Sequence, residues 1–117
     1  MPVKKFSDVE ANEIGAAVKT TIQVLISSEE APHFAMRRIV MGVGGLMPLH
    51  TNTVEHEQLV LSGRGRVGLG DEVYEVEKDT VLYIPAGLPH FYETIGDEPF
   101  VFLCSVPNLP DKVEVLA

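Results

Sequence analysis

The sequence predicts an all-β protein in which about eight to ten short strands form a sandwich or a barrel. Runs rich in β-branched and aromatic residues recur along the chain, and turn-forming residues separate them at short intervals. The 8 prolines and 10 glycines fall almost entirely between these runs, where strands are expected to end. Because no long helical pattern separates the runs, alternating strand and helix units are not expected.

The size and the charge of the chain limit what it can do. A chain of 117 residues, 45% hydrophobic and 22% charged, suits one domain with a single core. We expect residues 1–117 to form that domain, with an N-terminal arm at 1–17 and a C-terminal tail at 107–117. The formal net charge of −8, without a cluster of basic residues, argues against a nucleic-acid partner.

The sequence also indicates the compartment. No apolar run reaches the roughly 18 residues of a membrane-spanning helix, and the first residues lack the apolar segment of a signal peptide. The single cysteine, Cys104, cannot form an internal disulfide, which agrees with a reducing compartment. We therefore expect a cytoplasmic protein without a membrane partner.

The first third of the chain is predicted to contain an arm and two strands. Residues 1–17 show no strong periodicity and are expected to form a polar arm whose order can depend on a partner. Residues 18–26 are rich in β-branched side chains and precede a polar loop, which predicts a strand. A second strand is expected at 34–43, ending at Gly44-Gly45.

The rest of the chain is predicted to continue as short strands with tight turns. Residues 57–62 and 66–69 flank the glycine turn Gly63–Gly65, which predicts a hairpin. Further strands are expected at 73–77, 80–84, 90–95 and 100–106, with an edge strand at 113–116.

Three of the four histidines gather on two short segments. His50 and His56 lie close together with Asn52 and two carboxylates, and His90 ends the segment Pro85-Ala-Gly-Leu-Pro-His90. Side chains alternate along a strand, so His50 and Asn52 face the same way, and His56 does too if the chain stays extended. Divalent transition metals accept neutral imidazole nitrogen and carbonyl or carboxyl oxygen, so the sequence indicates a metal site.

These segments resemble the two conserved motifs of the cupins. Residues 44–63 are similar to the first motif, a glycine, a short apolar gap, a histidine pair, a carboxylate and a final glycine. Residues 79–94 are similar to the second, with Pro-x-Gly-x-x-His at 85–90. The chain looks most like small single-domain cupins in which four histidines bind manganese or a similar metal. The resemblance implies a cupin double-stranded β-helix, that is, a jelly-roll barrel.

The resemblance also implies the ligands. His50, His56 and His90 match ligand positions, and Asn52 stands where the family has its second histidine. Neutral donors leave a divalent ion its full charge, so we expect a strong Lewis acid with weaker redox chemistry. Manganese or iron is expected first, and zinc, nickel, cobalt or copper also suits such donors. An alternative makes Glu57 the ligand in place of His56, although Glu57 lies out of parity with Asn52.

Four further residues are expected to line a substrate pocket. Arg37 and Arg38 must face opposite sides of their strand, and the resemblance favours Arg37 as the inward one, where it could bind a substrate carboxylate. Tyr92 shares parity with the nearest histidine and offers a hydroxyl group, unless it is a core tyrosine with a satisfied hydroxyl. Phe102 and Cys104 share one strand face, which the resemblance places toward the pocket.

Two functions fit this reading, and the fold alone does not decide between them. The first is a metal-dependent oxygenase that acts on a small organic molecule. The second is a non-catalytic module that binds or senses a small molecule, with a structural metal or none. A homodimer is expected in either case, because strand-forming segments at both ends could add to a neighbour's sheet and because similar cupins often form dimers.

Overall fold

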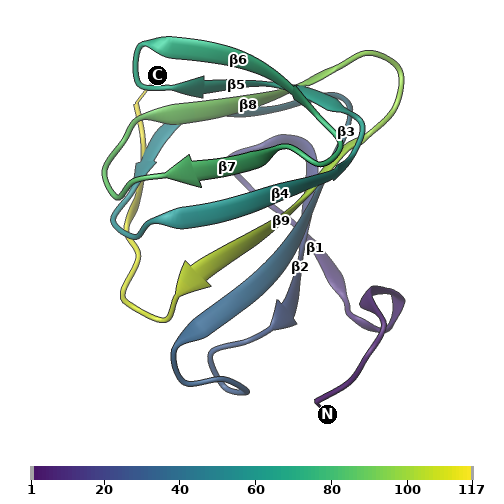
Figure 1. Ribbon diagram of the computed structural model, residues 1–117, viewed down its shortest axis with the longest axis vertical. Coiled ribbons are helices and arrows are strands. Elements are labelled where there is room, and N and C mark those ends of the chain that lie inside the picture. Colours follow the sequence, from purple (N-terminus) through teal and green to yellow (C-terminus); the bar gives the residue numbers. More distant parts are fainter. Residues whose placement is uncertain (1, 117) are drawn as a thin grey trace.

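The computed structural model describes residues 2–116, and within them it contains ten strands and one short 3-10 helix. The strands curl into a barrel, which confirms the predicted all-β jelly roll (Figure 1). No helix among the described residues is both long enough and apolar enough to cross a membrane. The elements are η1 (Phe6–Asp8), β1 (Ala11–Glu13), β2 (Val18–Ile26), β3 (Phe34–Asn52), β4 (His56–Ser62), β5 (Arg64–Leu69), β6 (Glu72–Glu77), β7 (Val81–Ile84), β8 (His90–Ile95), β9 (Phe100–Pro107) and β10 (Val113–Val115).

Strand β3 is the centre of the topology. The strand order is β6-β5-β8-β3-β9-β4-β7, and all neighbours are antiparallel. The first part of β3 pairs with β2 and β9, and its last part pairs with β8 and β10. One strand of 19 residues therefore belongs to both halves of the barrel.

The prediction that Gly44-Gly45 ends the second strand is wrong. The strand continues through both glycines to Asn52. Gly44 adopts φ +78°, a conformation open mainly to glycine, and the pairing with β2 is shifted close to this point. The glycines therefore bend the strand instead of ending it.

The predicted hairpin around Gly63 is also wrong. Strand β4 pairs with β7 and β9, whereas β5 pairs with β6 and β8. Gly63 has φ +74°, and a side-chain carbon there would overlap the carbonyl oxygen of Pro99. The chain thus passes from one layer of the barrel to the other at this glycine. Turn chemistry located the change of direction, but it did not identify the strands that pair.

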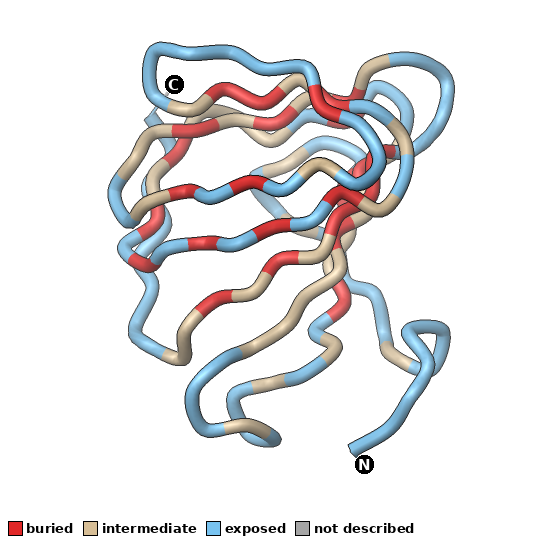
Figure 2. Tube along the Cα trace, in the orientation of Figure 1, coloured by how far each residue is buried: buried red, intermediate tan, exposed pale blue. Residues whose placement is uncertain are grey.

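The core lies between the two layers, and alternate residues of the strands face it (Figure 2). The ring of Phe102 is close to two other rings, stacked on Tyr92 at a centroid distance of 5.0 Å and tilted against Phe100 at 5.2 Å. Burial of such a side chain contributes roughly 1.5–3 kcal/mol. The buried core residues are Ile39, Met41, Val60, Val67, Val76, Leu82, Ile84, Tyr92, Phe100 and Phe102.

The N-terminal arm is more ordered than its sequence suggested. Its strand β1 pairs with β2, and the Gln23 side-chain amide donates to the carbonyl oxygens of Phe6 and Val9. The Arg38 guanidinium lies 4.0 Å from the centre of the Phe6 ring. Contacts within the chain therefore hold the arm, and its dependence on a partner stays a prediction.

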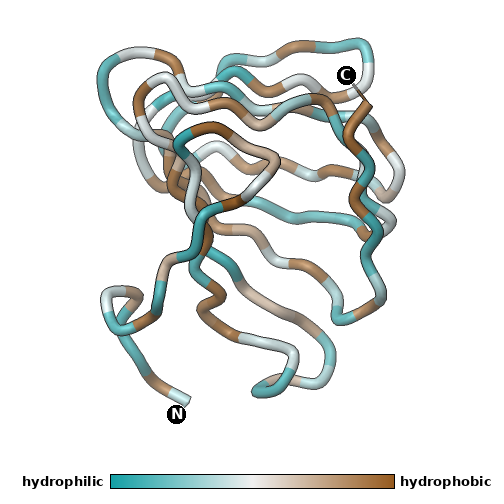
Figure 3. Tube along the Cα trace, turned by 180° about the vertical axis from the view of Figure 1, so that it is seen from behind, coloured by the Kyte–Doolittle hydropathy of each residue, from teal (hydrophilic) through white to brown (hydrophobic). Residues whose placement is uncertain are grey.

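The C-terminal segment runs along one side of the barrel (Figure 3). The expected edge strand is present as β10, which pairs with residues 50–52 of β3. Both terminal strands thus pair within this chain, and the expected homodimer stays a prediction.

We expect Gly63→Ala to lower the free energy of unfolding by more than 1 kcal/mol, because both the positive φ and the Pro99 carbonyl exclude a side chain. Gly15→Ala is the matched control, since a side-chain carbon at Gly15 would meet no atom within 4 Å. Urea unfolding of both variants checks this. Equal stability of the two would contradict the crossing that we describe at Gly63.

Candidate functional site

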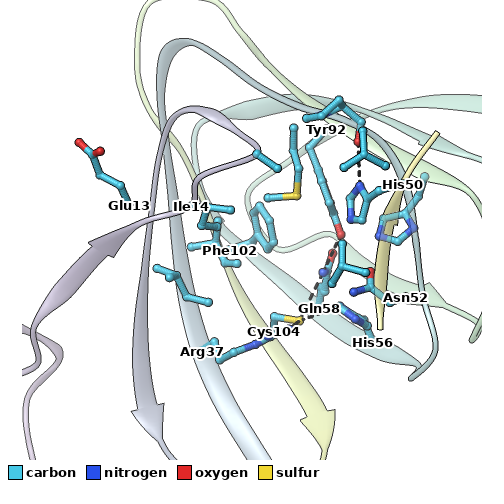
Figure 4. A pocket seen from close by; sticks show the side chains of 18 residues that line it. Glu13, Ile14, Arg37, His50, Asn52, His56, Gln58, Tyr92, Phe102 and Cys104 are labelled. Carbon is cyan, nitrogen blue, oxygen red and sulfur yellow. Dashed lines mark hydrogen bonds between the residues drawn. The ribbon is translucent and has the colours of Figure 1, made fainter. Parts of the chain in front are cut away.

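A cavity of about 360 Å³ lies inside the barrel (Figure 4). Strands β3, β4, β8 and β9 form its walls, and residues on or just after β1, on β2 and on β10 contribute to the lining. Every residue that the sequence predicted for the metal site or for the substrate pocket lines this cavity. These residues are Arg37, His50, Asn52, His56, His90, Tyr92, Phe102 and Cys104.

His50 and His90 are held in the same way. The Nδ1 atom of each ring lies 2.7–2.8 Å from a backbone carbonyl oxygen two residues earlier, that of Pro48 or Leu88. A carbonyl oxygen only accepts, so Nδ1 carries the proton and the Nε2 atom of the neutral ring keeps its lone pair. The ring centroids are 4.1 Å apart. Two nitrogen donors therefore come from adjacent strands, β3 and β8.

His56 occupies the opposite wall, at the start of β4. Its Nδ1 atom is 3.3 Å from the sulfur of Cys104, and its Nε2 atom is buried without a hydrogen-bond partner. A cation bound at Nε2 would require the proton to lie on Nδ1, which would then donate to the sulfur. The thiol of Cys104 can therefore orient this ring.

Burial keeps two of the histidines neutral. Desolvation, followed by the positive charge of Arg37, lowers the pKa of His56 from 6.5 to about 4. Desolvation also lowers the pKa of His90 to about 4, although its bond to the Leu88 carbonyl acts in the other direction. At neutral pH both rings are uncharged, as metal ligands or proton acceptors must be.

Asn52 is oriented by a residue far away in the sequence. Its Nδ2 atom donates to one carboxylate oxygen of Asp111 at 3.0 Å. The other carboxylate oxygen of Asp111 accepts from the backbone N–H of Thr53 at 3.0 Å. This arrangement identifies the nitrogen and the oxygen of the Asn52 amide, since only the nitrogen donates. The Oδ1 atom of Asn52 is left buried without a partner.

The donor atoms, an amide oxygen and imidazole nitrogens, are of kinds that divalent metals bind. Buried lone pairs without partners remain on Asn52 Oδ1, His56 Nε2 and His90 Nε2. Among residues 2–116, however, no group of three or more His, Cys, Asp or Glu side chains is close enough to hold an ion as it stands. A bound ion would therefore require these side chains to adjust. The His56 and His90 ring centroids are 6.0 Å apart.

The alternative ligand Glu57 is not in the cavity. The side chains of β4 alternate between buried and exposed, and Glu57 is exposed. Its neighbour His56 is buried and lines the cavity. The geometry therefore favours His56 of the two alternatives.

Two residues near the donors were not among those predicted. Gln58 donates from Nε2 to the Tyr92 hydroxyl at 2.8 Å and to Cys104 Sγ at 3.4 Å, while its Oε1 atom is buried without a partner. Strand parity could have identified Gln58, which lies two positions after His56 on the same face. No local signal could have identified Asp111, which is 59 residues from Asn52.

Comparison with known proteins gives one family match and one sequence relative. Residues 37–106 match the family described as Cupin domain. An uncharacterized protein of Methanocaldococcus jannaschii is 37% identical over 71 residues, which cover 60% of this chain. The matched part spans 57% of that protein, so a large part of the relative has no counterpart in the alignment.

Solved structures with the same architecture include enzymes. The polyketide cyclase RemF from Streptomyces resistomycificus superposes with a TM-score of 0.89 at 28% identity, covering 100% of this chain and 87% of that one. A cupin-2 domain protein from Rhodospirillum rubrum gives 0.85 at 26% identity, with coverage of 98% and 80%. An oxalate decarboxylase from Lactobacillus farciminis gives 0.77 at 23% identity and covers 94% and 34%, a likeness of fold alone.

We expect chelator-treated protein to lose stability as the pH falls from about 6.5 toward 4. The pKa values of His56 and His90 are about 4 in the folded protein and 6.5 in the unfolded chain. Between pH 4 and pH 6.5 the unfolded chain therefore binds more protons than the folded protein. The stabilisation present above pH 6.5 is therefore lost as the pH falls. The loss is on the order of a few kcal/mol, because one pKa unit corresponds to about 1.4 kcal/mol and solvent screening reduces the full value.

Urea unfolding at a series of pH values measures this loss. The double variant with His56→Gln and His90→Gln should show a flatter profile than the parent, whereas the exposed His33→Gln should not. Identical profiles for the parent and the double variant would show that the two rings are solvated.

Proposed function

Because this chain belongs to the cupin family, we propose that it is a metal-dependent enzyme that acts on a small, largely apolar organic molecule. The observation that carries this proposal is the set of buried, unpartnered donor atoms on Asn52, His56 and His90, residues that line a cavity together with many apolar side chains. A buried polar atom without a partner costs about 1–3 kcal/mol. Such atoms favour an occupant that accepts their lone pairs, and a divalent transition ion does so.

The residues suit chemistry on a carbonyl compound. A divalent ion held by neutral donors would supply Lewis-acid polarisation of a carbonyl oxygen. Burial raises the pKa of Tyr92, so its hydroxyl group stays protonated; it accepts from Gln58 and can donate a hydrogen bond to a substrate instead of acting as a base. The apolar wall formed by Ile14, Met47 and Phe102 holds the body of the substrate and excludes water.

We therefore infer proton transfer or ring closure at an activated carbonyl group as the reaction class. The neutral donors support this inference, since no carboxylate among them would stabilise a trivalent metal. The likeness to a polyketide cyclase over the whole chain also supports it, although that name describes the other protein. A manganese- or iron-dependent dioxygenase is the second candidate, because imidazole donors suit both metals.

The reaction class can be tested with benzoylacetone, an apolar diketone with an acidic carbon. With manganese, iron or zinc added, hydrogen–deuterium exchange at that carbon without oxygen uptake supports proton-transfer chemistry. Oxygen uptake in proportion to substrate loss would favour the dioxygenase. If the diketone binds but neither reaction occurs with any of these metals, the non-catalytic binding module is the better account.

We expect His56→Ala to weaken divalent-metal binding by 100-fold or more, because it removes one of three imidazole donors. Glu57→Ala is the matched control, since it alters the next side chain on the same strand but on the outer face. Elemental analysis and calorimetric titration of both variants measure the effect. Loss of binding in Glu57→Ala but not in His56→Ala would reverse the ligand assignment.

We expect Asp111→Ala to weaken metal binding about 10- to 100-fold, because the amide of Asn52 would lose the bond that turns its oxygen inward. Asp71→Ala, in an exposed turn, should have no effect. The change should be much smaller in an Asn52→Ala background. An equal loss in that background would mean that Asp111 does not act through Asn52.

A further inference from the structure

We propose that the cavity selects an organic anion, a molecule with an apolar body and one anionic oxygen group that Arg37 binds. This inference rests on the proposed function and names its substrate class. It depends on the uncompensated charge of Arg37, on the absence of a competing carboxylate beside it, and on the polar groups that lie next to it.

Arg37 has no counterion among the residues that the structure describes. Its Nε atom is buried without a partner, and its Nη2 atom donates at 3.4 Å to the sulfur of Cys104, which is a weak acceptor. No carboxylate of residues 2–116 lies within 4.0 Å of this guanidinium. By contrast, Arg66 pairs with Glu93 at 3.0 Å on the outside of the barrel. A partly buried cation without a partner is costly, and an anionic ligand would remove that cost.

The cavity holds little negative charge to compete with a ligand. Glu13 carries the only carboxylate in the described lining, and Figure 4 shows it at the outer edge of the pocket, with its carboxylate pointing away from the other labelled side chains. Arg37 also borders a second cavity that includes Asp111, but that carboxylate already accepts bonds from Asn52 and Thr53.

Other polar groups beside Arg37 complete a binding surface. Cys104, Gln58 and Tyr92 form a hydrogen-bonded chain that leads away from the guanidinium across the pocket (Figure 4). The Oε1 atom of Gln58 is buried without a partner, and if the amide were turned round its nitrogen would be the free atom instead. Either way, Gln58 can bond a hydroxyl group on the ligand.

The size and the remaining lining of the cavity define the body of the ligand. A volume of about 360 Å³ is at the lower end of the range for small-molecule sites. Apart from the polar groups described above, mainly apolar side chains such as Ile39, Met47 and Phe102 face this space. The expected ligand is therefore a compact acid, such as an aromatic or aliphatic carboxylate or an acidic phenol, anchored at Arg37.

The test compares acids with their uncharged amides in the chelator-treated protein of residues 1–117. The probes are 2-naphthoate and decanoate, with 2-naphthamide and decanamide as controls, and calorimetric titration measures binding. We expect at least one acid to bind at least tenfold more tightly than its amide, and Arg37→Gln to abolish that preference. Arg66→Gln is the matched control, because it removes one positive charge outside the cavity and should leave binding unchanged.

Four results would overturn the inference. They are equal binding of acids and amides, no binding of either acid, a preference that survives Arg37→Gln, and a loss of stability in Arg37→Met. The last of these would show that Arg37 is structural, whereas an uncompensated cation should leave the melting temperature unchanged or higher when it is replaced.

A repeat of the titrations with added zinc or manganese separates this inference from the proposed function. If an acid binds only with the metal and regardless of Arg37, the assignment to Arg37 is wrong and the metal-dependent function stands. If Arg37-dependent binding occurs in protein that takes up no divalent ion, the substrate class stands and the metal-dependent function is wrong.

Discussion

A straight strand of the length of β3 does not fit inside this molecule. Nineteen extended residues would span about 60 Å, whereas the longest dimension of the protein is 38 Å. Arg37 and His50 alone would be about 43 Å apart along a straight strand, yet both line one cavity. The bend at Gly44-Gly45 is therefore the constraint on which the site depends. It lets one strand pair with both halves of the barrel and present side chains from its two ends to the same space.

The interior that this bend creates combines two environments that usually exclude each other. Aromatic and aliphatic side chains make up much of the cavity lining, and burial keeps His56 and His90 uncharged. Among them lie an amide oxygen, imidazole nitrogens and one guanidinium nitrogen that lack hydrogen-bond partners. Each lowers the stability of the folded protein. Sites that sacrifice stability in this way are usually sites of function, since an occupant recovers what the empty cavity loses.

Alternation along the strands accounts for most of what the sequence could predict. The parity rule predicted that His50 and Asn52 face the same way, and both line the cavity. It put Arg37 and the neighbouring arginine on opposite faces, and the family resemblance, not parity, favoured Arg37 as the inward one. The hairpin around Gly63 was wrong because the partner of a strand is set by contacts distant in sequence, here with β7 and β9. Asp111 was missed for the same reason. Strand periodicity determines which way a residue faces, but not which residue it meets.

The pairing of β10 with β3 bears on how the site exchanges its contents. This strand has three residues, all exposed, yet it pairs with residues 50–52 and follows the carboxylate that orients Asn52. Short exposed strands open locally at a small fraction of the free energy needed to unfold a whole domain. Detachment of β10 would loosen one wall of the cavity and release the amide of Asn52 at the same moment. The residence time of an occupant would then be set by the fraying of this strand, while the rest of the barrel stays folded.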